Sequence, residues 1–289
     1  MVKTNRKKAG DFLIAFFFLI LIAICLLPVL NIAAVSLSST QAIVNQRVSF
    51  LPVDFTLESY SYVLADKKFV NSLFFTLILT LVATVVSLTM TILCAYPLAQ
   101  RGLKGKKLIN VLIVMTMYFS AGTIPNYILM QNLKLLDNVL VLILPNCLSV
   151  FNMIILKSFF LGIPESLKES ARLDGAGHWT ILLKIYLPLS KSILATLALF
   201  YAVGRWNGFS DALMYMRNPK LYPLQLKLYQ VINNLAAVDT HLEGLSSTAV
   251  TGESMKAATV MFATIPIVII YPFVQRYFVA GVTTGAIKE

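Results

Sequence analysis

Six stretches of this sequence are long and apolar enough to cross a lipid bilayer as helices. A membrane-spanning helix needs about 20 mostly apolar residues. It also satisfies its own backbone N–H and C=O groups where the hydrocarbon offers no water. The six stretches are residues 11–35, 71–99, 108–130, 138–160, 188–213 and 256–279. The sequence therefore predicts an all-α membrane protein, with six transmembrane helices in a single domain over residues 1–289.

The overall composition excludes the common soluble classes. Apolar residues make up 58% of the chain and charged residues 13%, whereas soluble domains carry about 25% charged residues. That deficit argues against a typical soluble enzyme, and the excess of apolar side chains argues against disorder. The three cysteines, Cys25, Cys94 and Cys147, are scattered through apolar stretches. An odd and scattered set does not indicate a disulfide framework or a zinc site.

The first apolar stretch resembles a secretory signal, because it follows a basic head that contains Lys3, Arg6, Lys7 and Lys8. A signal peptide has an apolar region of about 7–15 residues, and the stretch 11–35 is longer than that. We therefore interpret it as an uncleaved first transmembrane helix.

The distribution of basic residues predicts the orientation. The basic head and the segment 101–107 each hold four basic residues and no acid, and the segment between the fourth and fifth stretches adds more. The segments 36–70, 131–137 and 215–255 spread their basic residues among acids. Cytoplasmic loops carry the excess of Lys and Arg, so we expect a multi-pass protein of the plasma membrane with both termini in the cytoplasm. This clustering also explains the net charge of +11 without nucleic acid as a partner.

The inner segment 162–187 has a readable local pattern. Pro164 suits the start of a helix, Asp174 and Gly175 break it, and a second helix restarts near Gly177 before Pro188. The pattern predicts helix, sharp turn, helix. One reading is an amphipathic linker on the membrane surface. The other is a docking element, because the acids Glu169 and Asp174 suit a protein partner that offers arginine.

This segment resembles the EAA loop of ABC importer permeases, in which Glu-Ala-Ala is followed by Asp-Gly-Ala and then Leu-Pro. Ser170 stands where the family usually has alanine. The C-terminal ending, the Trp-Asn element at 205–209 and the segment 221–226 are similar to maltose-type sugar permeases, in particular the lipoprotein and complex-polysaccharide subgroup. The matching residues of the loop are Glu169, Ser170, Ala171, Arg172, Leu173, Asp174, Gly175, Ala176, Leu187 and Pro188.

The resemblance implies a type I ABC importer permease fold and a set of partners. These are a second homologous permease, two ATPase subunits, an extracytoplasmic solute-binding protein, and a sugar or oligosaccharide as solute. ATP and Mg²⁺ would bind the ATPases, with no cofactor on this chain. The residues implied to couple to the ATPase are Glu169, Ser170, Ala171, Asp174, Gly175 and Ala176. The cytoplasmic tail 280–289 is implied to contact the ATPase through Gly281, Thr283, Gly285 and Lys288.

The longest polar stretch, residues 217–253, is expected to be an outer loop. Loops of such length are usually functional or disordered. The resemblance implies that this one reaches into the binding protein, and the alternative is a solvated cap over the helices.

Catalytic motifs are absent from the sequence. No Walker A pattern occurs in the sequence. The segment 102–107 contains glycine and lysine, but without the spacing that the pattern requires. The two histidines, His178 and His241, are separate and are interpreted as surface or capping residues rather than metal ligands. No Ser/His/Asp signature is present. We therefore expect a chain that is not itself an enzyme.

The fifth apolar stretch carries the candidates for a solute path, which are Tyr201, Arg205, Trp206 and Asn207. A charge within a membrane is costly, and it marks a functional site by default. Sugars bind to aromatic faces together with a few hydrogen-bonding groups. The alternatives are that Arg205 reaches the interface or pairs with Asp211 or the partner permease, and that Trp206 belongs to the interfacial aromatic belt.

Three other functions were weighed against a sugar importer. A stand-alone secondary transporter favours inverted repeats and an intramembrane relay of acids, and neither is visible. A membrane-embedded enzyme needs histidines or acids gathered at depth, which the sequence does not offer. An ABC permease for a solute other than a sugar remains an alternative.

Overall fold

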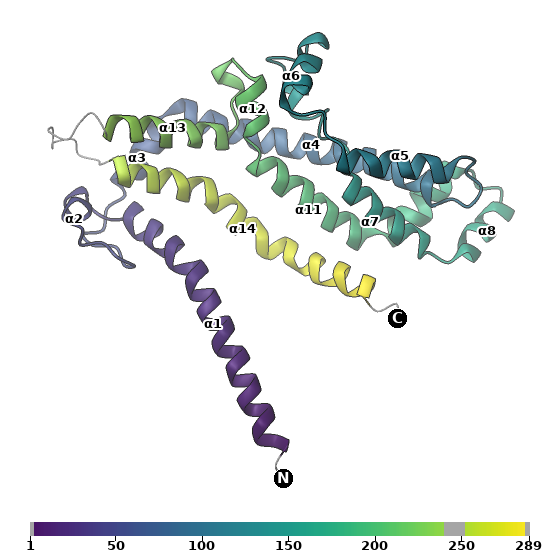
Figure 1. Ribbon diagram of the computed structural model, residues 1–289, viewed down its shortest axis with the longest axis horizontal. Helices are drawn as coiled ribbons and strands as arrows, with labels where there is room; N and C mark the ends of the chain where they lie inside the picture. Colours follow the sequence, from purple (N-terminus) through teal and green to yellow (C-terminus); the bar gives the residue numbers. More distant parts are fainter. Residues whose placement is uncertain (1–2, 240–251, 287–289) are drawn as a thin grey trace. The chain divides into compact units, whose positions relative to one another are not determined.

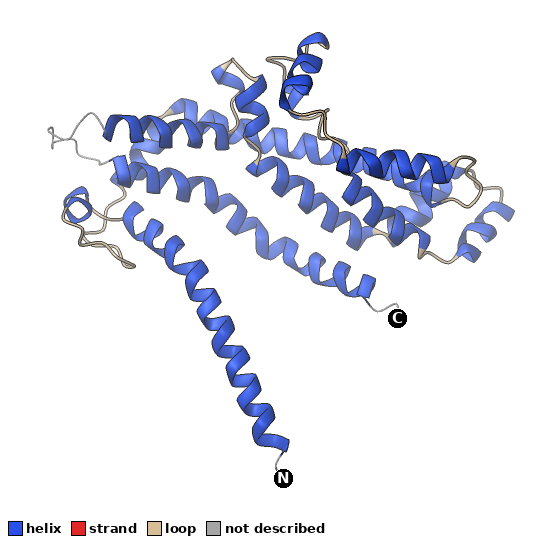
Figure 2. Cartoon of the chain, viewed as in Figure 1, coloured by secondary structure: helices blue, strands red, loops and turns tan. Residues whose placement is uncertain are grey.

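The computed structural model describes residues 3–239 and 252–286, and every regular element in these ranges is helical (Figures 1 and 2). The all-α prediction is thus confirmed. The helices up to residue 161 are α1 (Lys3–Ser36), α2 (Thr40–Val44), α3 (Glu58–Ala65), α4 (Lys67–Ala99), α5 (Lys106–Tyr118), α6 (Thr123–Asn132), η1 (Val139–Leu142) and α7 (Val150–Leu161). The remaining helices are α8 (Glu165–Leu173), α9 (His178–Ile181), η2 (Leu182–Tyr186), α10 (Leu187–Leu189), α11 (Lys191–Asn207), α12 (Ser210–Tyr215), η3 (Pro219–Leu221), α13 (Leu224–Asp239) and α14 (Gly252–Ala286).

The chain forms two compact units. The first comprises residues 1–70 and 227–266, and the second comprises residues 71–226 and 267–289. In the first unit, Val35, Ile43 and Ala257 form a small core. The rings of Phe69 and Phe262 lie 5.5 Å apart. Residues 11–30 of α1 are almost all exposed, as expected for a helix surrounded by lipid, whereas its end at Ala34–Ser36 is buried.

The second unit is organised around α4, which contributes to two separate cores. One core lies at the end of α4 around Tyr96 and includes residues of α7, α9, η2 and α11. The other lies earlier on α4, around Leu79 and Ala83, and includes residues of α6, η1 and α12. Helices α5 and α11 both pack against α7 (Figure 1). Helix α4 therefore links the two cores of the unit.

The apolar stretches are less regular than the sequence indicated. Three continuous helices, at Asp11–Ser36, Lys67–Ala99 and Gly252–Ile269, are long and apolar enough to span a membrane. Three further candidates are helix pairs bent by 114° (α5 and α6), 71° (α7 and α8) and 83° (178–189 and α11). Counting each bent pair as one span gives six in the described residues.

Three of the expected spans are interrupted, each at an identifiable place. Residues 108–130 break before Gly122, whose φ of +87° is left-handed. Residues 138–160 are helical only from Val150, after a 3₁₀ turn and a segment that contains Pro145, which has no N–H to donate. Residues 188–213 contain α11, then a break at Gly208, then α12.

The ends of the expected outer loop and tail also differ from the sequence-based boundaries. Within 217–253, residues 224–239 form α13 rather than a loop, while 240–251 lie outside the described residues. Helix α14 continues past residue 280 to Ala286, so the described part of the tail is helical. Lys288 and His241 lie outside the described residues.

Asp137 joins two loops that are distant in sequence. Its Oδ1 accepts hydrogen bonds from the backbone N–H groups of Arg217 (3.0 Å) and Asn218 (2.8 Å), and its own N–H donates to the carbonyl of Tyr215 (2.9 Å). The backbone bonds from Asn218 and Arg217 hold the pKa of the Asp137 carboxyl below its usual value. The residue also adopts a left-handed φ of +57°.

Asp137→Gly is expected to loosen this junction, because glycine accepts the left-handed φ without strain but removes the acceptor. Hydrogen exchange at the amides of Arg217 and Asn218 should become several-fold faster. Since the folded pKa is lowered, the stabilisation is present above the ordinary carboxyl pKa and is lost as the pH falls through the lowered value. Asp137→Asn, which keeps a neutral acceptor, should show an intermediate effect. Unchanged exchange in the glycine variant would contradict this account.

Candidate functional site

Residues 164–189 form an elbow whose turn is closed by backbone hydrogen bonds. The predicted helix–turn–helix is present: α8 ends at Leu173, Gly175 has a φ of +79°, and α9 begins at His178. The N–H of Ala176 donates to the carbonyl of Ala171 (2.9 Å), and that of Gly175 donates to Arg172 (3.0 Å). These two bonds are the Schellman pattern, which requires a left-handed residue at the position of Gly175.

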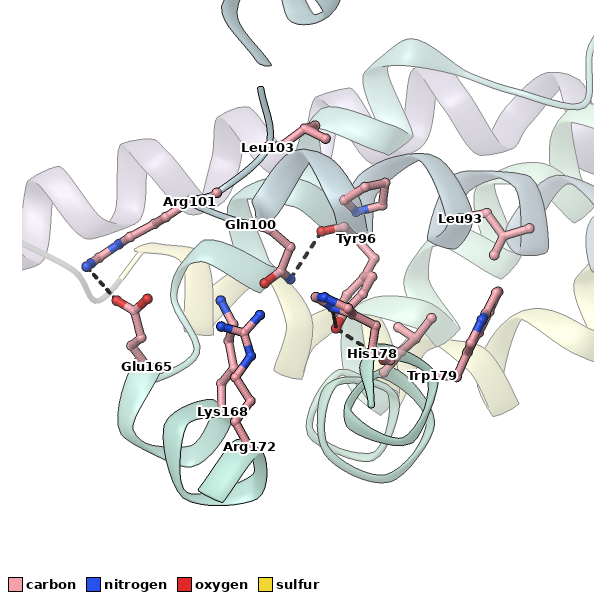
Figure 3. A pocket seen from close by; sticks show the side chains of 13 residues that line it. Leu93, Tyr96, Gln100, Arg101, Leu103, Glu165, Lys168, Arg172, His178 and Trp179 are labelled. Carbon is pink, nitrogen blue, oxygen red and sulfur yellow. Dashed lines mark hydrogen bonds and ion pairs between the residues drawn. The ribbon is translucent and has the colours of Figure 1, made fainter. Parts of the chain in front are cut away.

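The elbow is fastened to the end of α4. The Tyr96 hydroxyl donates to the carbonyl of His178 (3.2 Å; Figure 3). The Tyr96 ring also makes edge contacts with Phe160 and Tyr186. Arg101 forms an ion pair with Glu165 at 2.5 Å, although the Arg101 side chain is largely exposed, so this pair contributes little to stability. The apolar and aromatic packing therefore carries most of the attachment.

The coupling candidates divide into two groups by burial. Glu169, Ser170, Asp174 and Gly175 are exposed at the outer side of the elbow. Ala171 and Ala176 instead pack against this chain's own core around Tyr96. The neighbouring Leu173 is 89% exposed, which is unusual for leucine next to a rigid turn. The elbow thus presents two acids and an apolar side chain outward.

A second feature is a cavity of about 700 Å³ within the other part of the same unit, lined by residues of α4, α7, α11 and α12 and by the non-helical segment 143–149. Of the four solute-path candidates, Tyr201 and Arg205 line it. Trp206 is buried away from the cavity, and Asn207 is exposed and bonds to its own helix at Val203. The structure therefore brings two of the four candidates together.

Arg205 is held by a dense set of partners. Its two terminal nitrogens contact the Asp211 carboxylate at 2.5 and 3.0 Å, and they also donate to the carbonyls of Leu142 (2.8 Å) and Gly208 (3.0 Å). A Cβ at residue 208 would lie 2.9 Å from the guanidinium, so any larger residue here would have to displace the Arg205 side chain. Of the alternatives weighed for Arg205, the ion pair with Asp211 is the one present. It closes the break between α11 and α12.

Tyr201 also has a structural role. Its hydroxyl shares a 2.6 Å hydrogen bond with Thr91 of α4 and accepts the N–H of Ser149 (3.1 Å) at the start of α7. Its hydroxyl is thus engaged within the chain.

The sequence analysis did not identify the polar residues of the fourth apolar stretch (138–160) that line the cavity. Asn146 and Asn152 lie on either side of the start of α7, and Ser87 of α4 lines the same cavity. The Pro-Asn pair at 145–146 could have indicated a break in the helix there. Irregular backbone at membrane depth is tolerated where it lines a cavity or is buried in protein. The tail candidates Gly281, Thr283 and Gly285 lie in α14, and no side-chain contacts are described for them.

Comparison with known proteins decides the family. Residues 2–284 match the family described as "Binding-protein-dependent transport system inner membrane component". The chain belongs to this family. The family resemblance drawn from the elbow and the C-terminal ending is therefore confirmed.

Similar proteins cover nearly the whole chain. The polygalacturonan/rhamnogalacturonan transport system permease protein YtcP of Bacillus subtilis is 37% identical, over 98% of this chain and 99% of its own length. Protein LplC of Bacillus subtilis is 41% identical, over 92% and 90%. A solved bacterial ABC transporter, involved in the import of the acidic polysaccharide alginate, has a chain that matches with a TM-score of 0.88 and 33% identity, over 95% of this chain and 98% of that one.

Family membership fixes the general role of the chain. It is a multi-pass membrane permease subunit of an ABC transport system, which works in an assembly with a partner permease, an ATPase and a solute-binding protein. Such a subunit is not an enzyme, because ATP hydrolysis belongs to the separate ATPase subunit. The elbow and the cavity beside α11 are the two candidate sites for that role.

Gly175→Ala is expected to weaken the elbow turn. Nothing lies within 4 Å of a Cβ at this position, so the cost is the left-handed φ alone, about 1 kcal/mol. Hydrogen exchange at the amides of Gly175 and Ala176 should accelerate by roughly fivefold. Gly177→Ala is the matched control, because Gly177 is extended with a φ of −73° and is equally open. Equal effects of the two substitutions would refute the role assigned to the turn.

Arg205→Met is expected to destabilise the purified chain by about 3–5 kcal/mol, because it leaves the half-buried Asp211 carboxylate without its cation. The double variant Arg205→Met/Asp211→Asn should recover much of this loss, since no unpaired charge remains. Thermal melting in detergent of both variants and of Asp211→Asn would measure the coupling. Additive losses would show that the two residues act independently.

Proposed function

We propose that this chain is a permease subunit that imports a sugar or oligosaccharide across the plasma membrane, driven by ATPases that dock on the elbow. The carbohydrate solute is supported by the names of two similar proteins, a polygalacturonan/rhamnogalacturonan permease and a transporter for alginate. The observation that carries the mechanism is the elbow itself, whose exposed outer side is rigidly attached to the core of the second unit.

The elbow has the properties of a docking lever. Glu169 and Asp174 are exposed carboxylates that can pair with arginines of an ATPase, and such charge-assisted pairs are among the stronger hydrogen bonds. Leu173 offers apolar area beside them. Because packed cores shift between discrete arrangements rather than deforming continuously, a movement imposed on the elbow would pass through the aromatic cluster to α4, α7 and α11.

The expected assembly contains a second homologous permease, two ATPase subunits that hold ATP and Mg²⁺, and an extracytoplasmic binding protein. The basic residues of the N-terminal head, of segment 101–107 and of the elbow favour the cytoplasm for this side of the chain. Both termini would then lie in the cytoplasm, with the tail residues Gly281, Thr283, Gly285 and Lys288 near the ATPase. The outer residues 217–253 would face the binding protein.

The cavity beside α11 is the proposed solute path. It offers the ring of Phe200, the ring of Tyr201 and the amides of Asn146 and Asn152, and this mixture of flat apolar faces and hydrogen-bonding groups suits a sugar. Arg205 would shape the wall rather than bind the solute through a free charge, because Asp211 neutralises it.

Glu169→Lys tests the docking lever. In the transporter reconstituted with its ATPases and binding protein, this reversal should weaken ATPase association by at least about tenfold and abolish sugar uptake. Glu58→Lys, a matched change at an exposed acid of α3, should leave both unchanged. Sugar uptake driven by an ion gradient without any ATPase would support a secondary transporter instead.

Gly204→Phe tests the solute path. Gly204 lines the cavity, and nothing lies within 4 Å of a Cβ at this position, so a phenylalanine ring can enter the cavity without a clash at its root. Uptake of oligogalacturonides by the reconstituted transporter should fall several-fold, with ATPase association unchanged. Gly204→Ala should transport normally. Full activity of the phenylalanine variant would place the path elsewhere.

A further inference from the structure

A second cavity, of about 730 Å³, lies at the root of the elbow, where the end of α4 and the loop at 100–103 face α8 and α9 (Figure 3). Its lining has two chemically different parts. Three cations, Arg101, Lys168 and Arg172, contribute to one part. Leu93, Trp179 and Leu182 contribute an apolar part. Neither the docking side of the elbow nor the solute path uses this cavity.

Lys168 is buried without a counter-charge. It is only 7% exposed, and it makes no hydrogen bond or ion pair with any residue in the part of the chain that the structure describes. Figure 3 shows its side chain and that of Arg172 pointing into the cavity, toward Gln100. Glu165, which also lines the cavity, is paired with Arg101. The cavity therefore faces two cations, Lys168 and Arg172, that pair with no carboxylate in the described part of the chain. This local excess of positive charge favours a negatively charged occupant.

Gln100 adds a second requirement. Its Nε2 donates to the carbonyl of Tyr96 (3.3 Å), but its Oε1 is buried and has no hydrogen-bond donor. Leaving such an acceptor unsatisfied costs about 1–3 kcal/mol. An occupant that carries a hydroxyl group beside its anionic group would donate to Gln100 Oε1 and neutralise the cations at the same time. Inorganic phosphate alone has no such alcohol group.

The apolar part of the lining is open rather than enclosed. Leu93 is 40% exposed and Trp179 is 66% exposed, and both lie next to the basic group of residues. Tryptophan is enriched at the headgroup level of membranes. Basic pockets between transmembrane helices on the cytoplasmic side bind anionic lipid headgroups. The cavity therefore combines an anion site with a surface that an acyl chain or a glycerol backbone can follow.

We propose that this cavity binds a glycerophosphate group, supplied by the headgroup of an anionic phospholipid or by a free glycerol phosphate. The phosphate lies against Lys168 and Arg172, and a glycerol hydroxyl donates to Gln100 Oε1. Because the cavity is lined by both α4 and the two helices of the elbow, the occupant bridges them and stiffens the attachment of the elbow. This inference concerns ligand binding alone and does not depend on the solute that the transporter carries.

Native mass spectrometry and calorimetry on the full-length chain distinguish the two sources. One arm uses nanodiscs that contain phosphatidylglycerol, compared with nanodiscs of phosphatidylcholine alone. The other arm titrates glycerol 3-phosphate into the phosphatidylcholine nanodiscs. Retention of phosphatidylglycerol without binding of glycerol 3-phosphate supports a lipid, and saturable binding of glycerol 3-phosphate supports the free ester.

Charge-removing variants identify the site. Lys168→Gln and Arg172→Gln should each weaken binding of the retained probe by about tenfold, and Lys168→Arg should preserve it. Lys184→Gln is the matched control, because Lys184 is an exposed lysine of the same elbow that does not line the cavity. Arg172 is exposed, so its variant should fold even where the Lys168 variant does not.

Three results would overturn the proposal. The first is the absence of binding above the phosphatidylcholine background in both arms. The second is an equal loss of binding in Lys184→Gln. The third is a structure of the assembled transporter in which a carboxylate side chain of the ATPase fills the cavity.

Discussion

The contact between Tyr96 and the elbow is the interaction on which the second unit depends. The Tyr96 ring packs edge-on against Phe160 of α7 and Tyr186 of η2, while its hydroxyl holds the backbone of His178. One side chain thus joins α4 to three other helical elements, α7, α9 and η2. Its hydrogen bond satisfies a carbonyl near the start of α9, and its ring supplies the apolar area that exposed ion pairs such as Arg101–Glu165 cannot replace. Without it, the elbow would lose its central aromatic contact and keep only the rest of its apolar packing and the exposed Arg101–Glu165 pair.

The breaks in the apolar helices are the second organising feature. Each break leaves backbone groups without helical partners, and the structure provides replacements from elsewhere. Arg205 bonds the carbonyls of Leu142 and Gly208, and the Tyr201 hydroxyl accepts the N–H of Ser149. Tyr201 and Arg205 also line the cavity beside α11, so its polar wall and the repair of the broken backbone are made by the same residues. A charged side chain in this position thus has a structural role in stabilising irregular backbone.

The sequence predicted the features that depend on local physics. Apolar length gave the helical class, and the Asp-Gly pair gave the turn at Gly175. The 119–122 and 143–149 breaks were missed because apolar length does not show which backbone bonds are lost, and a proline alone is compatible with a continuous membrane helix. Helical spacing alone does not show which face of α11 meets the cavity, so it could not separate Tyr201 and Arg205, which line it, from Trp206 and Asn207, which do not. The burial of Lys168 depends on α4 and the loop after it, far away in the sequence, and no local pattern could reveal it.

Helix α4 is 33 residues long, which corresponds to about 50 Å at 1.5 Å per residue. It contributes Ser87 to the wall of the cavity beside α11 and Tyr96 to the attachment of the elbow. These two residues are nine positions apart on the same helix, which is about 13 Å along its axis. A tilt or shift of this part of α4 would therefore displace the cavity wall and the elbow attachment together, because no flexible joint is available between them to absorb the motion.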